Sequence, residues 1–188
     1  MSASPIVRNE ALQQPWFEAA QEILSTEGYG ALKQTAVCKK LGVTTGAFYH
    51  SFGSWQEFTD AFLENWRRER TTQLIELAQS QGDPVAQLQL LAGVSSDLRH
   101  RTEAAIRVWG SVDPRVGAVQ RSVDDDRYNV VVAAMAELVG PDHAEQFAVW
   151  GLSTLVGFEQ LSDRFSSDDL FWSLSQILSA ALNHQAAK

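Results

Sequence analysis

The sequence predicts an all-α protein of about nine helices, with a small three-helix unit at the N-terminus followed by a larger helical body. Three observations predict this fold class. Apolar residues recur at helical spacing along most of the chain, and glycine, proline and serine clusters interrupt that spacing at intervals. No segment shows the period-two alternation of a half-buried strand. We expect the N-terminal unit to occupy residues 1–56 and the body residues 57–188.

The N-terminal unit has the pattern of a helix-turn-helix. Its three helices are expected at residues 13–27, 33–41 and 45–50. Pro15 lies near a first-turn position of the first helix, and Gly28 follows its end. Gly42 provides the turn after the second helix, and Thr44 can cap the third. Two short helices joined by a short turn that contains glycine are typical of this motif.

A capping box begins the fourth helix at Ser54, whose side chain can accept from the backbone of Glu57 while Glu57 reaches back. This helix is expected to run to the break at residues 82–84. Its predicted inward positions are Phe58, Phe62, Trp66, Leu74 and Leu77. The remaining helices are expected at residues 84–93, 96–109, 114–139, 143–161 and 168–183.

The composition is that of an ordinary soluble protein, with 45% hydrophobic and 20% charged residues. The N-terminus lacks the apolar core of a signal peptide, and the longest apolar stretch is far too short to span a bilayer. Cys38 is the single cysteine, which excludes an intramolecular disulfide, and its place on an inner helix face predicts an inert core thiol. We therefore expect a cytoplasmic protein with no membrane segment.

The net charge of −8 is unfavourable for a protein that binds nucleic acid, but its distribution is not. Residues 1–56 hold four basic and four acidic residues, so the excess negative charge lies in the body. Residues 28–56 contain three lysines and no carboxylate, although the whole chain has 23 acidic residues. This segment can therefore face a polyanion without repelling it.

Residues 28–58, GYGALKQTAVCKKLGVTTGAFYHSFGSWQEF, resemble the TetR family of bacterial transcriptional regulators. The resemblance is carried by Leu41-Gly42-Val43-Thr44, Gly46, Phe48-Tyr49 and Phe52. Weaker similarities further along the chain, in residues 103–109, 113–114 and 123–127, resemble one actinobacterial branch of that family. The resemblance implies a transcriptional repressor that binds double-stranded DNA at a palindromic operator and is released by a small-molecule effector.

The residues of the third helix suit contact with bases. Gly46 lets the backbone approach the DNA closely, while Thr45, Ala47 and His50 project toward the groove. The resemblance assigns base recognition to these four residues. It assigns phosphate contacts to Lys33, Thr44 and Tyr49.

Two positions depart from the family pattern. Trp55 replaces a lysine that is usual at the start of the fourth helix, and Ser51 replaces a frequent histidine. Loss of the lysine removes one phosphate partner and should lower the salt dependence of binding by about one unit. We therefore expect modest affinity rather than a different function.

The last two helices are expected to form a homodimer interface. Residues 147–158 and 170–187 carry no acidic or basic residue apart from a histidine, so these helices are apolar on more than one side. A second copy of the same surface would cover them in a two-fold dimer, which the resemblance also favours. The alternative is that both helices lie at the centre of one chain.

Aromatic residues in the body suggest an effector site for an apolar or aromatic molecule, since regulators of this family usually hold an effector between these helices. His100 and Arg107 are its possible polar anchors. The aromatic candidates are Phe62, Trp66, Trp109, Tyr128, Phe147, Trp150 and Phe158. The alternative is plain core packing, with Arg107 in a helix-surface ion pair with Glu103.

No metal site, cofactor site or catalytic constellation is predicted. The run Asp124-Asp125-Asp126 is interpreted as a solvated face, because successive helical residues point about 100° apart and cannot converge on one ion. The histidines show no metal-ligand spacing, and no phosphate loop or nucleophile elbow is present. Two alternatives remain, a ligand-binding or scaffold protein of the same fold that no longer binds DNA, and a helical hydrolase.

Overall fold

The computed structural model describes residues 10–186, and within this range every regular element is a helix. The α-helices are α1 (Glu10–Glu27), α2 (Gln34–Leu41), α3 (Thr45–Ser51), α4 (Trp55–Arg67), α5 (Gln73–Gln79), α6 (Pro84–Ser96), α7 (His100–Val112), α8 (Pro114–Val139), α9 (Pro141–Leu161) and α10 (Ser167–Ala186). A short 3₁₀ helix (Tyr29–Ala31) follows α1, and a π turn (Arg68–Thr72) joins α4 to α5. The all-α prediction is confirmed.

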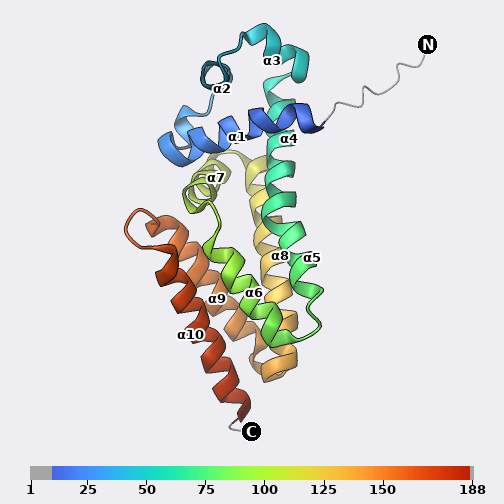
Figure 1. The fold of residues 1–188 in the computed structure, drawn as a ribbon, viewed down its shortest axis with the longest axis vertical. Coiled ribbons are helices and arrows are strands. Elements are labelled where there is room, and N and C mark those ends of the chain that lie inside the picture. The colour runs from blue at the N-terminus through green and yellow to red at the C-terminus, as the bar shows by residue number, and fades with distance from the viewer. Residues whose placement is uncertain (1–9, 187–188) are drawn as a thin grey trace, which may run out of the picture.

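The molecule is elongated, with α1, α2 and α3 at one end of its long axis and the C-terminal end of α10 at the other (Figure 1). The long α4 leads from the N-terminal helices into the body, and α7 lies directly beneath α1. In the body, α8 and α9 pack against each other, and α6 and α10 complete the bundle. None of the helices described is long and apolar enough to cross a membrane.

The predicted fourth helix is a continuous rod made of α4, the π turn and α5, so counting it as one gives the nine helices expected. The predicted inward face of α5 is wrong at one position. Leu74 packs inward as expected, but Leu77 is 48% exposed, whereas its neighbour Ala78 is fully buried. The buried stripe of α5 therefore passes through Leu74 and Ala78, which are four residues apart, and leaves Leu77 outside it.

Several predicted helix boundaries are also wrong by three or four residues, including the ends of α7 at Val112 and of α10 at Ala186. The first helix begins at Glu10, which places Pro15 inside it rather than in its first turn. Helix α6 continues through Gly93 to Ser96, and α7 begins at His100. A single glycine weakens a helix by only about 1 kcal/mol, so packing of the flanking apolar residues keeps α6 intact.

The core is continuous across the predicted domain boundary. Phe48 and Phe52 of the N-terminal unit share one hydrophobic cluster with Phe62 and Trp66 of α4 and with Trp109 of α7. A second cluster holds α6, α8, α9 and α10 together. The division at residue 56 thus stays a prediction. Cys38 is buried in the first cluster, and burial raises the pKa of its thiol, as expected of an unreactive core cysteine.

Candidate nucleic-acid interface and internal cavity

The turn between α2 and α3 has the geometry that the sequence predicted. Gly42 adopts the left-handed conformation, with φ 67° and ψ 28°, which a residue with a side chain rarely adopts. Thr44 is extended, and its Oγ1 accepts a hydrogen bond from the N–H of Ala47 at 3.3 Å. The capped N-terminus of α3 is thereby held at a fixed angle to α2.

Helix α3 separates a buried anchor from an exposed face. Phe48 is fully buried, and its ring meets Trp16 edge-on with centroids 5.5 Å apart. Tyr49 is 56% exposed, and its hydroxyl donates to Oε1 of Gln34 on α2 at 3.5 Å. The other side chains predicted to contact DNA lie at the surface: Lys33, Thr44, Thr45 and His50 are exposed, as is Gly46, and Ala47 is half-buried. The structure therefore brings these seven residues to one end of the molecule.

Gly46 is not required by the fold. A Cβ placed on it would meet Oγ1 of Thr44 at 3.6 Å, an ordinary van der Waals distance, and Gly46 has no positive φ. The absence of a side chain therefore has no internal explanation in α3. It suits a close approach of the backbone to a ligand outside the protein.

Trp55 takes a packing role in place of the family's lysine. The Trp55 ring lies 6.0 Å from the Phe48 ring and 5.0 Å from the Phe58 ring, measured between centroids. The side chain thus links α3 to α4 through the aromatic cluster. Its neighbour Ser54 caps α4 as predicted, and the Glu57 carboxylate accepts from the N–H of Gly53.

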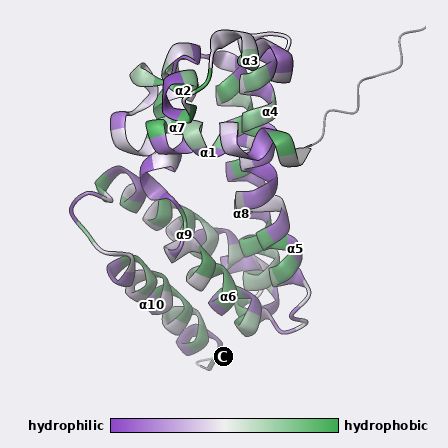
Figure 2. Ribbon diagram, turned by 45° about the horizontal axis from the view of Figure 1, so that its top comes forward, coloured by the Kyte–Doolittle hydropathy of each residue, from purple (hydrophilic) through white to green (hydrophobic). Residues whose placement is uncertain are grey.

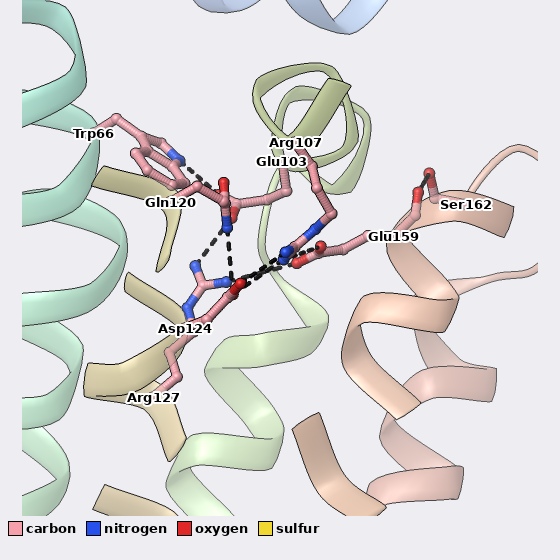
Figure 3. Close-up of polar contacts among 8 residues, drawn as sticks. All are labelled: Trp66, Glu103, Arg107, Gln120, Asp124, Arg127, Glu159 and Ser162. Atoms are coloured by element: carbon pink, nitrogen blue, oxygen red, sulfur yellow. Dashed lines mark hydrogen bonds and ion pairs between the residues drawn. The ribbon is translucent and has the colours of Figure 1, made fainter. Parts of the chain in front are cut away.

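A buried polar network connects α4, α7, α8 and α9 (Figure 3). Trp66 Nε1 donates to Oε1 of Glu103 at 2.7 Å, and Nη2 of Arg127 contacts the other Glu103 oxygen at 3.0 Å. Arg107 contacts Asp124 at 2.7 Å and Glu159 at 3.2 Å. The predicted ion pair between Arg107 and Glu103 is therefore wrong, because helix packing offers Arg107 nearer partners on α8 and α9.

This network also corrects the interpretation of one residue of the aspartate run, since Asp125 is exposed and the Asp126 side chain is 43% exposed, as predicted. The Asp124 side chain is 25% exposed and paired with Arg107, so it does not lie on a solvated face. Among the residues described, no group of three or more histidine, cysteine or acidic side chains is placed to hold a metal ion.

Glu159 is a strongly perturbed group of the network. Its side chain is fully buried, and burial raises the pKa of its carboxyl to about 7, with a further contribution from the negative charge of Glu103. Arg107 and Arg127 act in the opposite direction without offsetting these effects. Three carboxylates, those of Glu103, Asp124 and Glu159, face two guanidinium groups, so the network holds one excess negative charge when all are ionised.

An internal cavity of about 100 Å³, partly open to solvent, lies in the body, between the π turn, α5, α6, α8, α9 and α10. Its wall is mostly aliphatic and includes Leu74, Leu88, Met135, Leu152 and Ile177. Hydrophobic segments of α5, α6 and α9 are visible in this region in Figure 2. The sequence offers one signal for this wall, because residues 84–96 carry no charge.

The cavity does not contain the side chains expected to bind an effector, apart from Phe147. Phe62, Trp66 and Trp109 belong to the core beneath the helix-turn-helix. The remaining candidates also lie elsewhere: Tyr128 is half-buried, Trp150 is 50% exposed, Arg107 belongs to the polar network, and His100 packs edge-on against Phe158. Burial lowers the pKa of His100. Most of the aromatic residues that the sequence suggested for an effector site therefore lie outside this cavity.

Comparison with known proteins connects the N-terminal helices to one family. The family model described as bacterial regulatory proteins, tetR family, matches residues 17–61. A search of curated proteins gives no match. Among solved structures, a transcriptional regulator from Rhodococcus sp. Rha1 is similar with a TM-score of 0.74 at 20% identity, covering 90% of this chain and 95% of that one.

Two further solved structures have the same fold. A TetR-family transcriptional regulator from Streptomyces coelicolor has a TM-score of 0.75 at 14% identity, covering 93% of this chain and 97% of that one. The transcriptional regulator FadR from Bacillus subtilis, solved in complex with stearoyl-CoA, has a TM-score of 0.67 at 14% identity, covering 91% and 98%. These similarities extend the family's fold over the body as well.

Proposed function

Because the chain belongs, through its N-terminal domain, to the TetR family of bacterial regulatory proteins, we propose that it represses transcription from a palindromic operator and is released by a small molecule. The observation that carries this proposal is the exposed face of α3, held rigidly by Gly42, the Thr44 cap and the buried Phe48. A role on chromosomal DNA would place the protein in the cytoplasm.

In the proposed complex α3 enters the major groove. Thr45, Gly46, Ala47 and His50 meet base edges. Lys33, Thr44 and Tyr49 contact phosphates on either side of the groove. All of them except the half-buried Ala47 are exposed at the same end of the molecule, which supports this assignment.

The proposed operator is palindromic because the regulator is proposed to act as a homodimer through α9 and α10. Large apolar side chains are exposed on both helices, with Trp150 at 50%, Phe171 at 47% and Trp172 at 63%. Large apolar side chains left in water on two neighbouring helices are typical of an interaction surface. A second copy is the occupant proposed here.

Release is proposed to pass from the cavity to the DNA-binding helices through the polar network. Arg127 lines the cavity and contacts Glu103, which accepts a hydrogen bond from Trp66 of α4 (Figure 3). Helix α4 follows α3 after a short turn. A ligand that moves Arg127 would therefore shift α4 and change the separation of the two recognition helices in the dimer.

Selection of bound fragments from genomic DNA by the purified protein tests DNA binding and identifies the site. With the selected duplex, Lys33→Ala should weaken binding and lower the salt slope by about one unit. Tyr49→Phe should weaken binding while keeping the ring that packs on Phe48. Arg164→Ala removes an exposed charge from the loop between α9 and α10, outside the proposed DNA-binding face, and serves as the control.

Failure to enrich any duplex, or unchanged affinity in both variants, would contradict the proposal. The net charge of −8 and Trp55 would then favour a ligand-binding or scaffold protein of the same fold that does not bind DNA.

A further inference from the structure

The wall of the internal cavity contains a buried hydroxyl group with no hydrogen-bond partner. Thr71 is 1% exposed, lines the cavity, and its Oγ1 has no partner within the described structure. A threonine in a helix usually donates to the carbonyl one turn earlier. Thr71 lies instead in the π turn Arg68–Thr72, a rare feature that often marks a functional site. Because a buried hydroxyl without a partner is costly, this group is suited to a ligand.

The charge of the same wall selects against ionised ligands. Among the described residues, the charged residue that lines the cavity is Arg127, whose guanidinium contacts Glu103 at 3.0 Å and Glu159 at 3.6 Å. A carboxylate ligand would therefore approach two carboxylates as well as the guanidinium. A cationic ligand would meet Arg127 itself, and both would lose their hydration in an aliphatic wall. An uncharged ligand avoids both costs.

The volume limits the size of what fits without rearrangement. A cavity of about 150 Å³ in an engineered protein interior binds benzene. The cavity found here measures about 100 Å³, so it encloses an aliphatic group of about four carbons. Longer ligands would have to extend between the helices that surround it.

We propose that this cavity binds an uncharged aliphatic molecule with one hydroxyl or carbonyl group, and that this group pairs with the hydroxyl of Thr71. The inference rests on the proposed function only in treating this ligand as the effector. Binding itself can be measured without DNA. The positioning of the polar group by Thr71 fixes which end of the molecule lies against the π turn.

Three probes with the same six-carbon chain test the ligand class by isothermal titration calorimetry at neutral pH: 1-hexanol, hexanoate and hexylammonium. We expect 1-hexanol to bind at least about tenfold more tightly than either ion, because both ions are desolvated without a compensating partner. Equal or tighter binding of hexanoate would overturn the inference. Absence of binding by all three would also overturn it, whatever the result with DNA.

Two substitutions test the role of Thr71. Thr71→Val keeps the shape of the side chain and should weaken binding of 1-hexanol about fivefold, the effect of one hydrogen bond. Thr71→Ser restores a hydroxyl and should recover most of the affinity. Unchanged affinity in Thr71→Val would show that the hydroxyl does not position the ligand.

Thr102→Val is the matched control. Thr102 is 2% exposed, its hydroxyl donates to the carbonyl of Gln21 at 3.3 Å, and it does not line the cavity. Its replacement should lower the melting temperature and leave the affinity for 1-hexanol unchanged. Thr71→Val should instead raise the melting temperature without ligand, because it removes a buried hydroxyl that has no partner.

The two proposals fail separately. Binding of 1-hexanol that depends on Thr71, in a protein that enriches no duplex, would support the cavity site and reject the regulator. If instead the protein enriches a duplex and binds it with the same affinity in the presence and absence of 1-hexanol, that result would reject this class of molecule as effector.

Discussion

At the scale of single residues, Gly46 is a position where the fold tolerates a side chain but the proposed contact with DNA does not. Alanine at this position meets nothing closer than 3.6 Å inside the protein, and alanine favours a helix over glycine by about 0.5–1 kcal/mol. Gly46→Ala should therefore unfold at an equal or higher denaturant concentration while its affinity for the selected duplex falls. Chemical denaturation and a DNA-binding titration on the same preparation measure both effects. Unchanged DNA affinity would remove Gly46 from the proposed interface.

Glu159 makes the stability depend on pH. Its pKa is raised to about 7 in the folded protein from an ordinary value of 4.5, so the protonated carboxyl stabilises the fold at low pH. That contribution is lost as the pH rises through 7, because the buried group then ionises beside Glu103. We expect the free energy of unfolding to fall by about 1 kcal/mol between pH 6 and pH 8 from this group.

Glu159→Gln should remove that part of the pH dependence, since glutamine does not ionise. The remaining network then has two carboxylates, Glu103 and Asp124, for two guanidinium groups. The measurement is the difference between the two proteins in urea denaturation at each pH, which cancels the titration of His100 and other groups common to both. Parallel pH profiles would contradict the assignment to Glu159.

At the scale of elements, the hairpin of α7 and α8 depends on a close contact between two glycines. Asp113 caps α8 by accepting from the N–H of Arg115 at 3.0 Å. A Cβ on Gly117 would lie 2.6 Å from the carbonyl oxygen of Gly110, closer than real Cβ contacts allow. The same two helices carry Glu103, Arg107, Asp124 and Arg127, so their crossing also sets the polar network.

Gly117→Ala should therefore lower the free energy of unfolding by about 1–3 kcal/mol, the usual cost of overpacking. Gly93→Ala is the matched control, because a Cβ on Gly93 of α6 meets nothing within 4 Å. That variant should be more stable by about 0.5–1 kcal/mol, as expected for alanine inside a helix. A Gly117→Ala protein as stable as the unmodified one would show that the two helices separate without cost.

At the scale of the whole molecule, the exposed apolar surface of α9 and α10 leads to a prediction about assembly. Trp172→Glu places a charge where the side chain is 63% exposed and should give a monomer in sedimentation experiments. Val112→Glu, at a position 65% exposed on α7, is the control and should leave the dimer intact. If both variants are dimers, Trp172 does not belong to the interface. If both variants and the unmodified protein are monomers, the dimer itself is rejected.

Local patterns were sufficient to predict the helices, the glycine turn at Gly42, the Thr44 cap and the exposed face of α3. These features depend on residues within a few positions of one another, where backbone conformation and hydrogen bonding follow directly from residue type. The same holds for most helix boundaries. The error at Leu77 arose because positions three and four residues after Leu74 both fit helical spacing, and packing buries Ala78 rather than Leu77.

Packing between distant segments decided the partners of Arg107, the burial of Glu159 and the position of the cavity. Arg107 meets Asp124 and Glu159, which lie 17 and 52 residues further along the chain. Counting aromatic residues could not locate the cavity, because core and cavity use the same apolar side chains. Helical spacing predicts which face of a helix turns inward. How the helices cross decides which helix covers this face and how much space is left between the two.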